Sequence, residues 1–163
     1  MLQASLQGVV EKLLSEVQTF YGERLVSLAL YGSVGRGTPS FDSDIDFLIL
    51  ARDLPAGRMK RIREYDPVEE RLTPLIESLR TDGIHTSLSP IIKSPEEALQ
   101  GSPLFLDMVE DAKILFDSGG FFAGVLASLR NRLQALGSQR VRLGNAWYWI
   151  LKPDIKGGEV FEI

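Results

Sequence analysis

The segment from which the fold can be inferred reads LVSLALYGSVGRGTPSFDSDIDFLIL and runs from Leu25 to Leu50. It begins with an almost unbroken apolar run up to Tyr31, which is typical of a strand covered on both faces. A glycine-rich loop and a polar turn follow, and a second apolar run begins at Ile45 and is interrupted only by Asp46. The sequence therefore predicts a strand, a glycine-rich loop and a second strand as the organising unit of the first third of the chain.

Asp44 and Asp46 stand at the start of the second predicted strand. Because they are two residues apart on a strand, both carboxylates project from one face, while Ile45 and Phe47 point to the other. Two like charges this close are costly in a half-buried sheet unless a cation neutralises them. Carboxylate oxygens are hard ligands, so Mg²⁺ is the natural partner and Mn²⁺ an alternative. For such a pair taken alone, a solvated strand end is the simpler interpretation.

The loop Gly32-Ser-Val-Gly-Arg-Gly-Thr38 directly follows the first predicted strand. Its backbone N–H groups and hydroxyls can surround an anion, and Arg36 adds a positive charge. The glycine spacing matches neither a P-loop nor the dinucleotide-binding fingerprint, and Ser33 does not sit in a hydrolase nucleophile motif. A plain glycine turn is the alternative for the loop taken alone.

Helices and a third strand are predicted around this unit. Apolar periodicity predicts an amphipathic helix over residues 2–20. A charged helical pattern covers residues 58–80, and Pro67 and Pro74 are expected to limit its continuity. The alternation from Ile84 to Ile92 predicts a strand. Strands that alternate with helices indicate an α/β or α+β protein.

The composition is that of an ordinary globular domain of 163 residues, 44% hydrophobic and 25% charged, with a net charge of -4. This balance provides no wholesale basic surface for nucleic acid. The lack of cysteine excludes disulfides, thiolate zinc sites and cysteine nucleophiles, and the single histidine excludes a histidine metal cluster. No apolar run has the length of a membrane helix, and the N-terminal segment is unlike a signal peptide. We therefore expect a soluble, cytoplasmic protein with no membrane partner.

Basic and aromatic residues gather near the C-terminus. Between Arg130 and Lys156 there are six basic residues and one acidic residue, and Trp147, Tyr148 and Trp149 lie among them. Such a cluster can hold single-stranded nucleic acid or the acidic face of a partner. The simpler interpretation is that the tryptophans pack onto the domain while the arginines stay solvated.

An acidic stretch precedes this cluster in the chain. It consists of Asp107, Glu110 and Asp111. Its simplest interpretation is a solvated helix face.

Gly32-Ser33, ten intervening residues and Asp44-Ile-Asp46 together resemble the signature of the DNA polymerase beta-type nucleotidyltransferase superfamily. The segment is most similar to the small stand-alone prokaryotic members, the minimal nucleotidyltransferases. Members of that group often pair with helical HEPN proteins as the antitoxin half of a toxin–antitoxin module. The specific match covers about residues 25–51, and the order of predicted elements extends it to about residue 92.

The resemblance implies a nucleotidyltransferase fold of the α/β (α+β) class. Its small mixed sheet would carry the aspartate pair, with helices packed mainly on one side and a C-terminal helical extension. We expect residues 1–118 to form the nucleotidyltransferase core. Residues 119–163 are expected to form a C-terminal helix and a basic, aromatic tail packed on that core within one domain.

The resemblance also implies an activity. The reaction would be Mg²⁺-dependent transfer of a nucleoside monophosphate, most simply AMP from ATP, to a protein or RNA acceptor. Gly32 and Ser33 would hold the triphosphate, and we add Arg36 to the phosphate contacts because it lies in the same loop. Asp44 and Asp46 would be the catalytic residues that bind the divalent ions bridging the phosphates.

This chain departs from the pattern of the family at one position. Catalytic members place a third carboxylate on a following strand, but the segment from Ile84 to Ile92 contains no Asp or Glu and shows His85, Ser87 and Ser89 instead. Two hypotheses therefore stand: an active nucleotidyltransferase, or a weak or inactive nucleotide-binding antitoxin or regulatory module paired with a helical HEPN-type partner. His85 is a candidate base, although a lone strand histidine is more often a packed or surface residue.

Overall fold

Two antiparallel strands form the middle of the main sheet. The computed structural model describes all residues from 1 to 163. The two apolar runs form β1 (Leu25–Tyr31) and β2 (Ile45–Ala51). On either side of them, β3 (Leu88–Lys93) pairs in parallel with β2, and β4 (Lys113–Asp117) pairs antiparallel with β1. The strand order is therefore β3-β2-β1-β4, with β3 and β4 at the edges.

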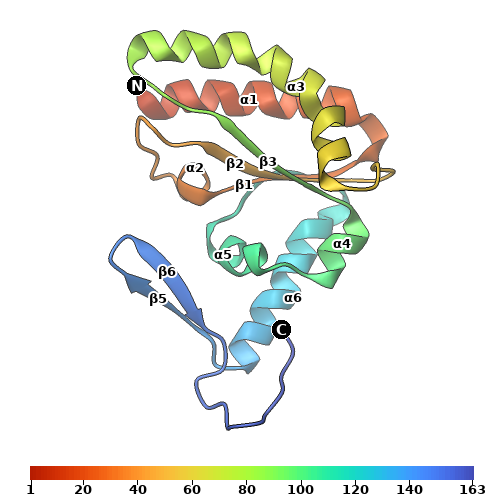
Figure 1. Cartoon of the computed structure of the whole chain (residues 1–163), viewed down its shortest axis with the longest axis vertical. Helices are drawn as coiled ribbons and strands as arrows, with labels where there is room; N and C mark the ends of the chain where they lie inside the picture. The colour runs from red at the N-terminus through yellow and green to blue at the C-terminus, as the bar shows by residue number, and fades with distance from the viewer.

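Helices cover both faces of this sheet (Figure 1). The helices are α1 (Leu2–Tyr21), α2 (Gly32–Arg36), α3 (Arg58–Leu79), α4 (Pro95–Gln100), α5 (Pro103–Asp111) and α6 (Phe121–Ala135). Short 3₁₀ turns follow three elements, at η1 (Gly22–Arg24), η2 (Arg80–Asp82) and η3 (Ser118–Gly120). None of the helices combines the length and the apolar character that a membrane crossing requires.

Each face of the sheet carries its own apolar core. Leu28, Leu30 and Phe47 pack with α1 and α3, whereas Leu48 and Leu50 pack with α4, α5 and α6. Strands that are apolar on both faces must be covered on both faces. The predicted mixed α/β fold is confirmed, but the helices pack on both faces of the sheet instead of mainly on one.

Helix α3 runs through Pro67 and Pro74 without interruption, although the sequence predicted limited continuity there. Proline removes one backbone donor and crowds the carbonyl four residues earlier. Both prolines are exposed, and their spacing of two helical turns places them on the same, solvent-facing side. Water can satisfy the freed carbonyls there, and the buried side with Tyr65, Val68 and Leu72 stays regular.

The third strand is shorter than the sequence predicted. A strand was expected from Ile84 to Ile92, but β3 begins only at Leu88. Upstream of it, the His85 N–H donates to the Phe41 carbonyl at 2.7 Å. This bond ties residues 84–87 to the polar turn before β2, which explains why the regular ladder begins later.

The C-terminal segment contains a hairpin that the sequence did not predict. β5 (Gln139–Leu143) and β6 (Ala146–Ile150) pair antiparallel and form a second, two-stranded sheet (Figure 1). Gly144 and Asn145 make the two-residue turn, and Gly144 supplies the positive φ of 61° that such turns need. The predicted helix is present as α6, whereas part of the predicted tail is this hairpin.

Candidate active site

The aspartate pair lies at the beginning of β2, on the face of the sheet that α5 and α6 cover. Ile45 and Phe47 are fully buried in the core beneath α1 and α3. Because side chains alternate along a strand, Asp46 points to the opposite face. Asp44 is exposed and Asp46 is half-buried. The pair is therefore open to a ligand from the side of α2 and α5.

Two serines, Ser87 just before β3 and Ser89 within it, contact the two carboxylates. The backbone N–H and the hydroxyl of Ser87 donate to Asp44 Oδ1 at 3.1 and 2.6 Å. In the parallel register of β2 and β3, Ser89 lies beside Asp46. The serines thus occupy the place at which the resemblance implied a third carboxylate. No group of three histidine, cysteine, aspartate or glutamate side chains in the chain is placed to hold a metal.

His85 is not part of this arrangement. The residue precedes β3, its side chain is exposed, and its imidazole makes no hydrogen bond or ion pair within the chain. The imidazole makes no hydrogen bond to Asp44 or Asp46.

Gly32 brings the backbone into direct contact with Asp46. A Cβ atom at position 32 would lie 2.4 Å from Asp46 Oδ2, and the φ of 64° at Gly32 is unfavourable for any side chain. This conformation turns the chain from β1 into α2, a single short helix where the sequence predicted a loop. The Ser33 hydroxyl in this helix makes no hydrogen bond within the protein. Gly32 is therefore in contact with Asp46, and Ser33 follows it directly in α2.

Burial raises the pKa of the Asp46 carboxyl above its ordinary value. The negative charge of Asp44 adds to this effect, while the Ser89 hydroxyl and the Arg36 guanidinium oppose it. Burial also raises the pKa of Tyr31, with a contribution from Asp46, to about 12. The site therefore carries an excess of negative charge that the protein does not itself neutralise.

The donor set at this site fits a divalent cation. Two carboxylates supply hard oxygen ligands and negative charge, and the remaining ligands of such an ion commonly come from substrate phosphates and water. A bound cation would stabilise the charged form of Asp46, which burial and the charge of Asp44 disfavour. Asp44 and Asp46 are the residues that would hold it.

Arg36 lies near the pair but has a partner of its own. Its guanidinium contacts Asp111 Oδ2 of α5 at 3.2 Å. The Arg140 guanidinium from β5 donates two hydrogen bonds to the same carboxylate, with N–O distances of 3.0 and 2.6 Å. Burial alone would raise the pKa of Asp111, but the hydrogen bonds from Arg140 and Arg36 outweigh it and hold the pKa below the ordinary value. A phosphate contact by Arg36 would therefore compete with Asp111.

The C-terminal cluster docks onto α5. The Trp149 indole N–H donates to Asp107 Oδ1 at 3.1 Å, and the Arg140 guanidinium lies 4.5 Å from the centre of a Trp147 ring. Asp107 and Asp111 are thus partners of the hairpin. The interpretation of this stretch as a solvated helix face was wrong for Asp111, whereas Asp107 and Glu110 are exposed. The six basic residues that follow in the sequence were the available signal, because they offered counter-charges for these acids.

The chain is similar to known proteins over most of its length. A family model described as a nucleotidyltransferase domain matches residues 10–114. A protein of Methanocaldococcus jannaschii, named "Putative protein adenylyltransferase", is 28% identical over 127 residues, which are 77% of this chain and 81% of the relative.

Solved structures show a more distant likeness. A crystal structure of a toxin–antitoxin with AMP-PNP has 21% identity and a TM-score of 0.45, and the match covers 77% of this chain and 89% of that one. In a structure of a tri-AMPylated HEPN toxin of Shewanella oneidensis in complex with an MNT antitoxin, the matched chain has 18% identity and a TM-score of 0.39. The match covers 83% of this chain and 91% of that one.

The family match includes every element that builds the candidate site. Residues 10–114 contain β1, α2, β2 and β3, and with them Gly32, Ser33 and the aspartate pair. Nucleotidyltransferases generally use divalent metal ions, in agreement with the chemistry of the two carboxylates. The family inferred from the spacing of the glycine-serine pair and the acids is confirmed, and this chain belongs to the nucleotidyltransferase domain family.

Proposed function

We propose that this protein transfers AMP from ATP to a hydroxyl group of a protein acceptor. The observation that carries the proposal is the contact between Gly32 and the Asp46 carboxylate, which leaves no room for a Cβ atom. It places the start of α2 next to the Asp46 carboxylate, and a site for a triphosphate and its counter-ion requires such a neighbourhood. The name of the Methanocaldococcus jannaschii relative supports the choice of adenylyl transfer to a protein over transfer to RNA.

In this proposal each residue has a separate task. Gly32 and Ser33 hold the triphosphate, and Arg36 contacts a phosphate when it exchanges its Asp111 partner for the nucleotide. Asp44 and Asp46 hold Mg²⁺, for which Mn²⁺ can substitute. When bound, the ion neutralises the charge of the phosphates and of the two carboxylates.

The proposed transfer is a substitution at the α-phosphorus of ATP. The oxygen of the acceptor hydroxyl forms a bond to this phosphorus, and the bond from phosphorus to the bridging oxygen breaks. Pyrophosphate leaves with that oxygen, and the hydroxyl proton passes to solvent. Ser87 and Ser89 cannot accept the proton as a third carboxylate would, so we expect the transfer to be slow.

The test is a calorimetric titration with ATP, GTP, CTP and UTP, with and without Mg²⁺. We expect Mg²⁺-dependent binding, strongest for ATP, that the Asp44→Asn, Asp46→Asn double variant loses. Asp42→Asn is the matched control, because this exposed acid lies outside the pair and should leave binding unchanged. The absence of binding to every triphosphate, or binding that survives the double variant, would overturn the proposal.

A second candidate function is a nucleotide-binding antitoxin or regulatory module that acts through a helical HEPN-type partner. The observation that favours it is the serine pair in place of the third acid. This function requires nucleotide binding but no turnover. Radiolabel from α-³²P-ATP that appears on a co-purified HEPN-type protein would support transfer, whereas a stable complex without label would support the second candidate.

A further inference from the structure

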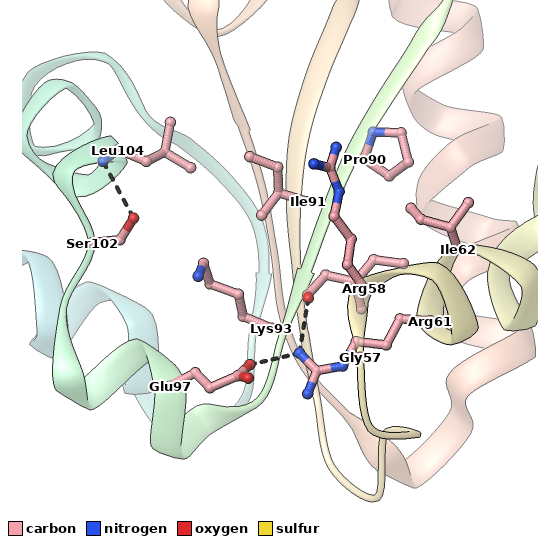
Figure 2. A pocket seen from close by; sticks show the side chains of 11 residues that line it. Gly57, Arg58, Arg61, Ile62, Pro90, Ile91, Lys93, Glu97, Ser102 and Leu104 are labelled. Carbon is pink, nitrogen blue, oxygen red and sulfur yellow. Dashed lines mark hydrogen bonds and ion pairs between the residues drawn. The ribbon is translucent and has the colours of Figure 1, made fainter.

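A cleft of about 440 Å³ opens beside the outer edge of β3 (Figure 2). One wall is β3 from Pro90 to Lys93, and a second is the first turn of α3 with Arg58 and Arg61. The third wall is the start of α5 at Ser102. Its lining combines apolar side chains of β3 with positively charged side chains from two elements.

Two of these positive charges make no hydrogen bond or ion pair in the protein, although the charge of Lys93 also helps to lower the pKa of Glu97. Arg61 is fully engaged, since it donates to the Pro55 carbonyl at 2.9 Å and pairs with Glu97 at 2.7 Å. The hydrogen bond from Arg61 holds the pKa of Glu97 below its ordinary value, so the acid in the cleft is neutralised by this pair. Arg58 and Lys93 make no hydrogen bond or ion pair, and Figure 2 shows both with free ends. In a chain of net charge -4, this is a local positive site.

The cleft and the aspartate pair lie alongside the same strand, β3. Ser89 lies beside Asp46, and Ile91 and Lys93 follow Ser89 on the same face of β3, because alternate residues share a face. At a rise of about 3.3 Å per residue, Lys93 lies roughly 13 Å along the strand from Ser89. An extended peptide covers that distance in about four residues.

The edge of β3 is unsuited to pairing with a further strand. Pro90 lacks a backbone donor, and the Ile92 carbonyl already accepts from Arg61 at 3.3 Å. A ligand of this cleft must therefore be recognised through side chains. Two free cations beside apolar Ile91 suit a carboxylate on a polypeptide, whereas a nucleic acid backbone needs a longer row of cations.

We infer that this cleft binds an acidic side chain of the acceptor protein, about four residues away from the hydroxyl that is modified. Lys93 binds the carboxylate on the side of β3 that carries Ile91, and Arg58, beside Pro90, adds positive charge at the other side of the strand edge. Ile91 contacts the apolar part of the acceptor. The inference rests on the proposed function, because it defines the acceptor of the same site.

The experiment measures the binding of a fluorescein-labelled hexaglutamate peptide by fluorescence anisotropy. We expect the Arg58→Gln, Lys93→Gln double variant to bind it about tenfold more weakly than the unchanged protein, because two charged contacts are lost. The matched control is Arg63→Gln, Arg80→Gln, which removes the same charge from exposed positions outside the cleft. The control should bind the peptide as the unchanged protein does.

Three outcomes would overturn the inference. They are no binding of the peptide, an equal loss in the control variant, and tighter binding of a labelled hexauridylate RNA that depends on Arg58 and Lys93. Titration with Mg²⁺ and ATP separates this inference from the proposed function. If the nucleotide binds and the peptide does not, only the cleft inference fails. If the peptide binds through Arg58 and Lys93 and no triphosphate binds, the proposed function fails, and the cleft stands as an acidic-peptide site.

Discussion

The molecule contains two pairs of aspartates that face opposite electrostatic conditions. Asp107 and Asp111 on α5 are one helical turn apart and receive arginine and tryptophan donors from the hairpin. Asp44 and Asp46 receive only serine donors. As a result the pKa of Asp111 is lowered and that of Asp46 is raised. The difference teaches that Asp107 and Asp111 are neutralised by donors from the hairpin, whereas Asp44 and Asp46 keep an uncompensated negative charge.

The largest expected effect comes from filling the space beside Asp44 and Asp46, the pair whose charge the protein does not neutralise. Gly32→Ala places a Cβ against Asp46 Oδ2, and we expect about a hundredfold loss of affinity for ATP with Mg²⁺ in calorimetry. Gly37→Ala is the matched control, because Gly37 has a similar φ of 75° but open space around it. It should lose about 1 kcal/mol of stability and keep its affinity. Equal losses of affinity in both variants would mean that backbone strain, and not the contact with Asp46, is responsible.

Breaking the ion pair between Arg140 and Asp111 should lower the stability of the fold. Arg140→Gln removes the main partner of Asp111, and both side chains are largely buried, with 13% and 9% of their surface exposed. We expect a loss of about 2 kcal/mol in the free energy of unfolding, measured with urea. Arg142→Gln on the same strand removes an exposed arginine, and we expect a change below about 0.5 kcal/mol. If the two variants unfold alike, the ion pair does not hold the hairpin.

Removing the charge of Asp111 and removing that of Asp46 should change the stability of the fold in opposite directions. EDTA excludes metal ions from both measurements. The lowered pKa of Asp111 means that its contribution to stability is present above the ordinary carboxyl value of 3.8 and is lost as the pH falls through the lowered pKa. The raised pKa of Asp46 means that its charge destabilises the folded state at neutral pH, and that this cost disappears as the pH falls below that pKa. At pH 7, Asp111→Asn should therefore lower the urea midpoint and Asp46→Asn should raise it. Shifts of the same sign would contradict the comparison.

The smallest expected effect tests whether the two regions communicate. Arg36 and Arg140 share Asp111, so without Arg140 the carboxylate should hold Arg36 more tightly and away from a phosphate. In a double-mutant cycle on the affinity for ATP with Mg²⁺, we expect Arg36→Ala and Arg140→Gln to be non-additive by about 0.5–1 kcal/mol. Additive effects would show that the hairpin does not influence the nucleotide site.

The parts that the sequence predicted well depend on local signals. β1, β2 and the acid pair were predictable because two apolar runs and a fixed spacing lie within one short segment. The hairpin was missed because the aromatic and basic residues from Arg140 to Trp149 suggested a surface tail more strongly than a strand pair. The role of Asp111 depends on a contact between residues far apart in the chain, which no local pattern encodes.

The cleft beside β3 could likewise not be predicted from the sequence. Arg58, Lys93 and Ser102 come from three separate elements and meet only because β3 is the edge strand next to α3 and the start of α5. Neither their spacing nor their residue types form a motif. Arg58 and Lys93 line one cleft only because the sheet packs against these helices.

The position of Pro90 in an edge strand has a consequence for the protein in concentrated solution. An exposed strand edge is a template on which another chain can assemble, and this is how native proteins begin to aggregate. At this edge the central residue has no N–H to offer, and the Ile92 carbonyl is already taken by Arg61. The sheet therefore ends at β3, and pairing of the sheets of two copies along this side is disfavoured.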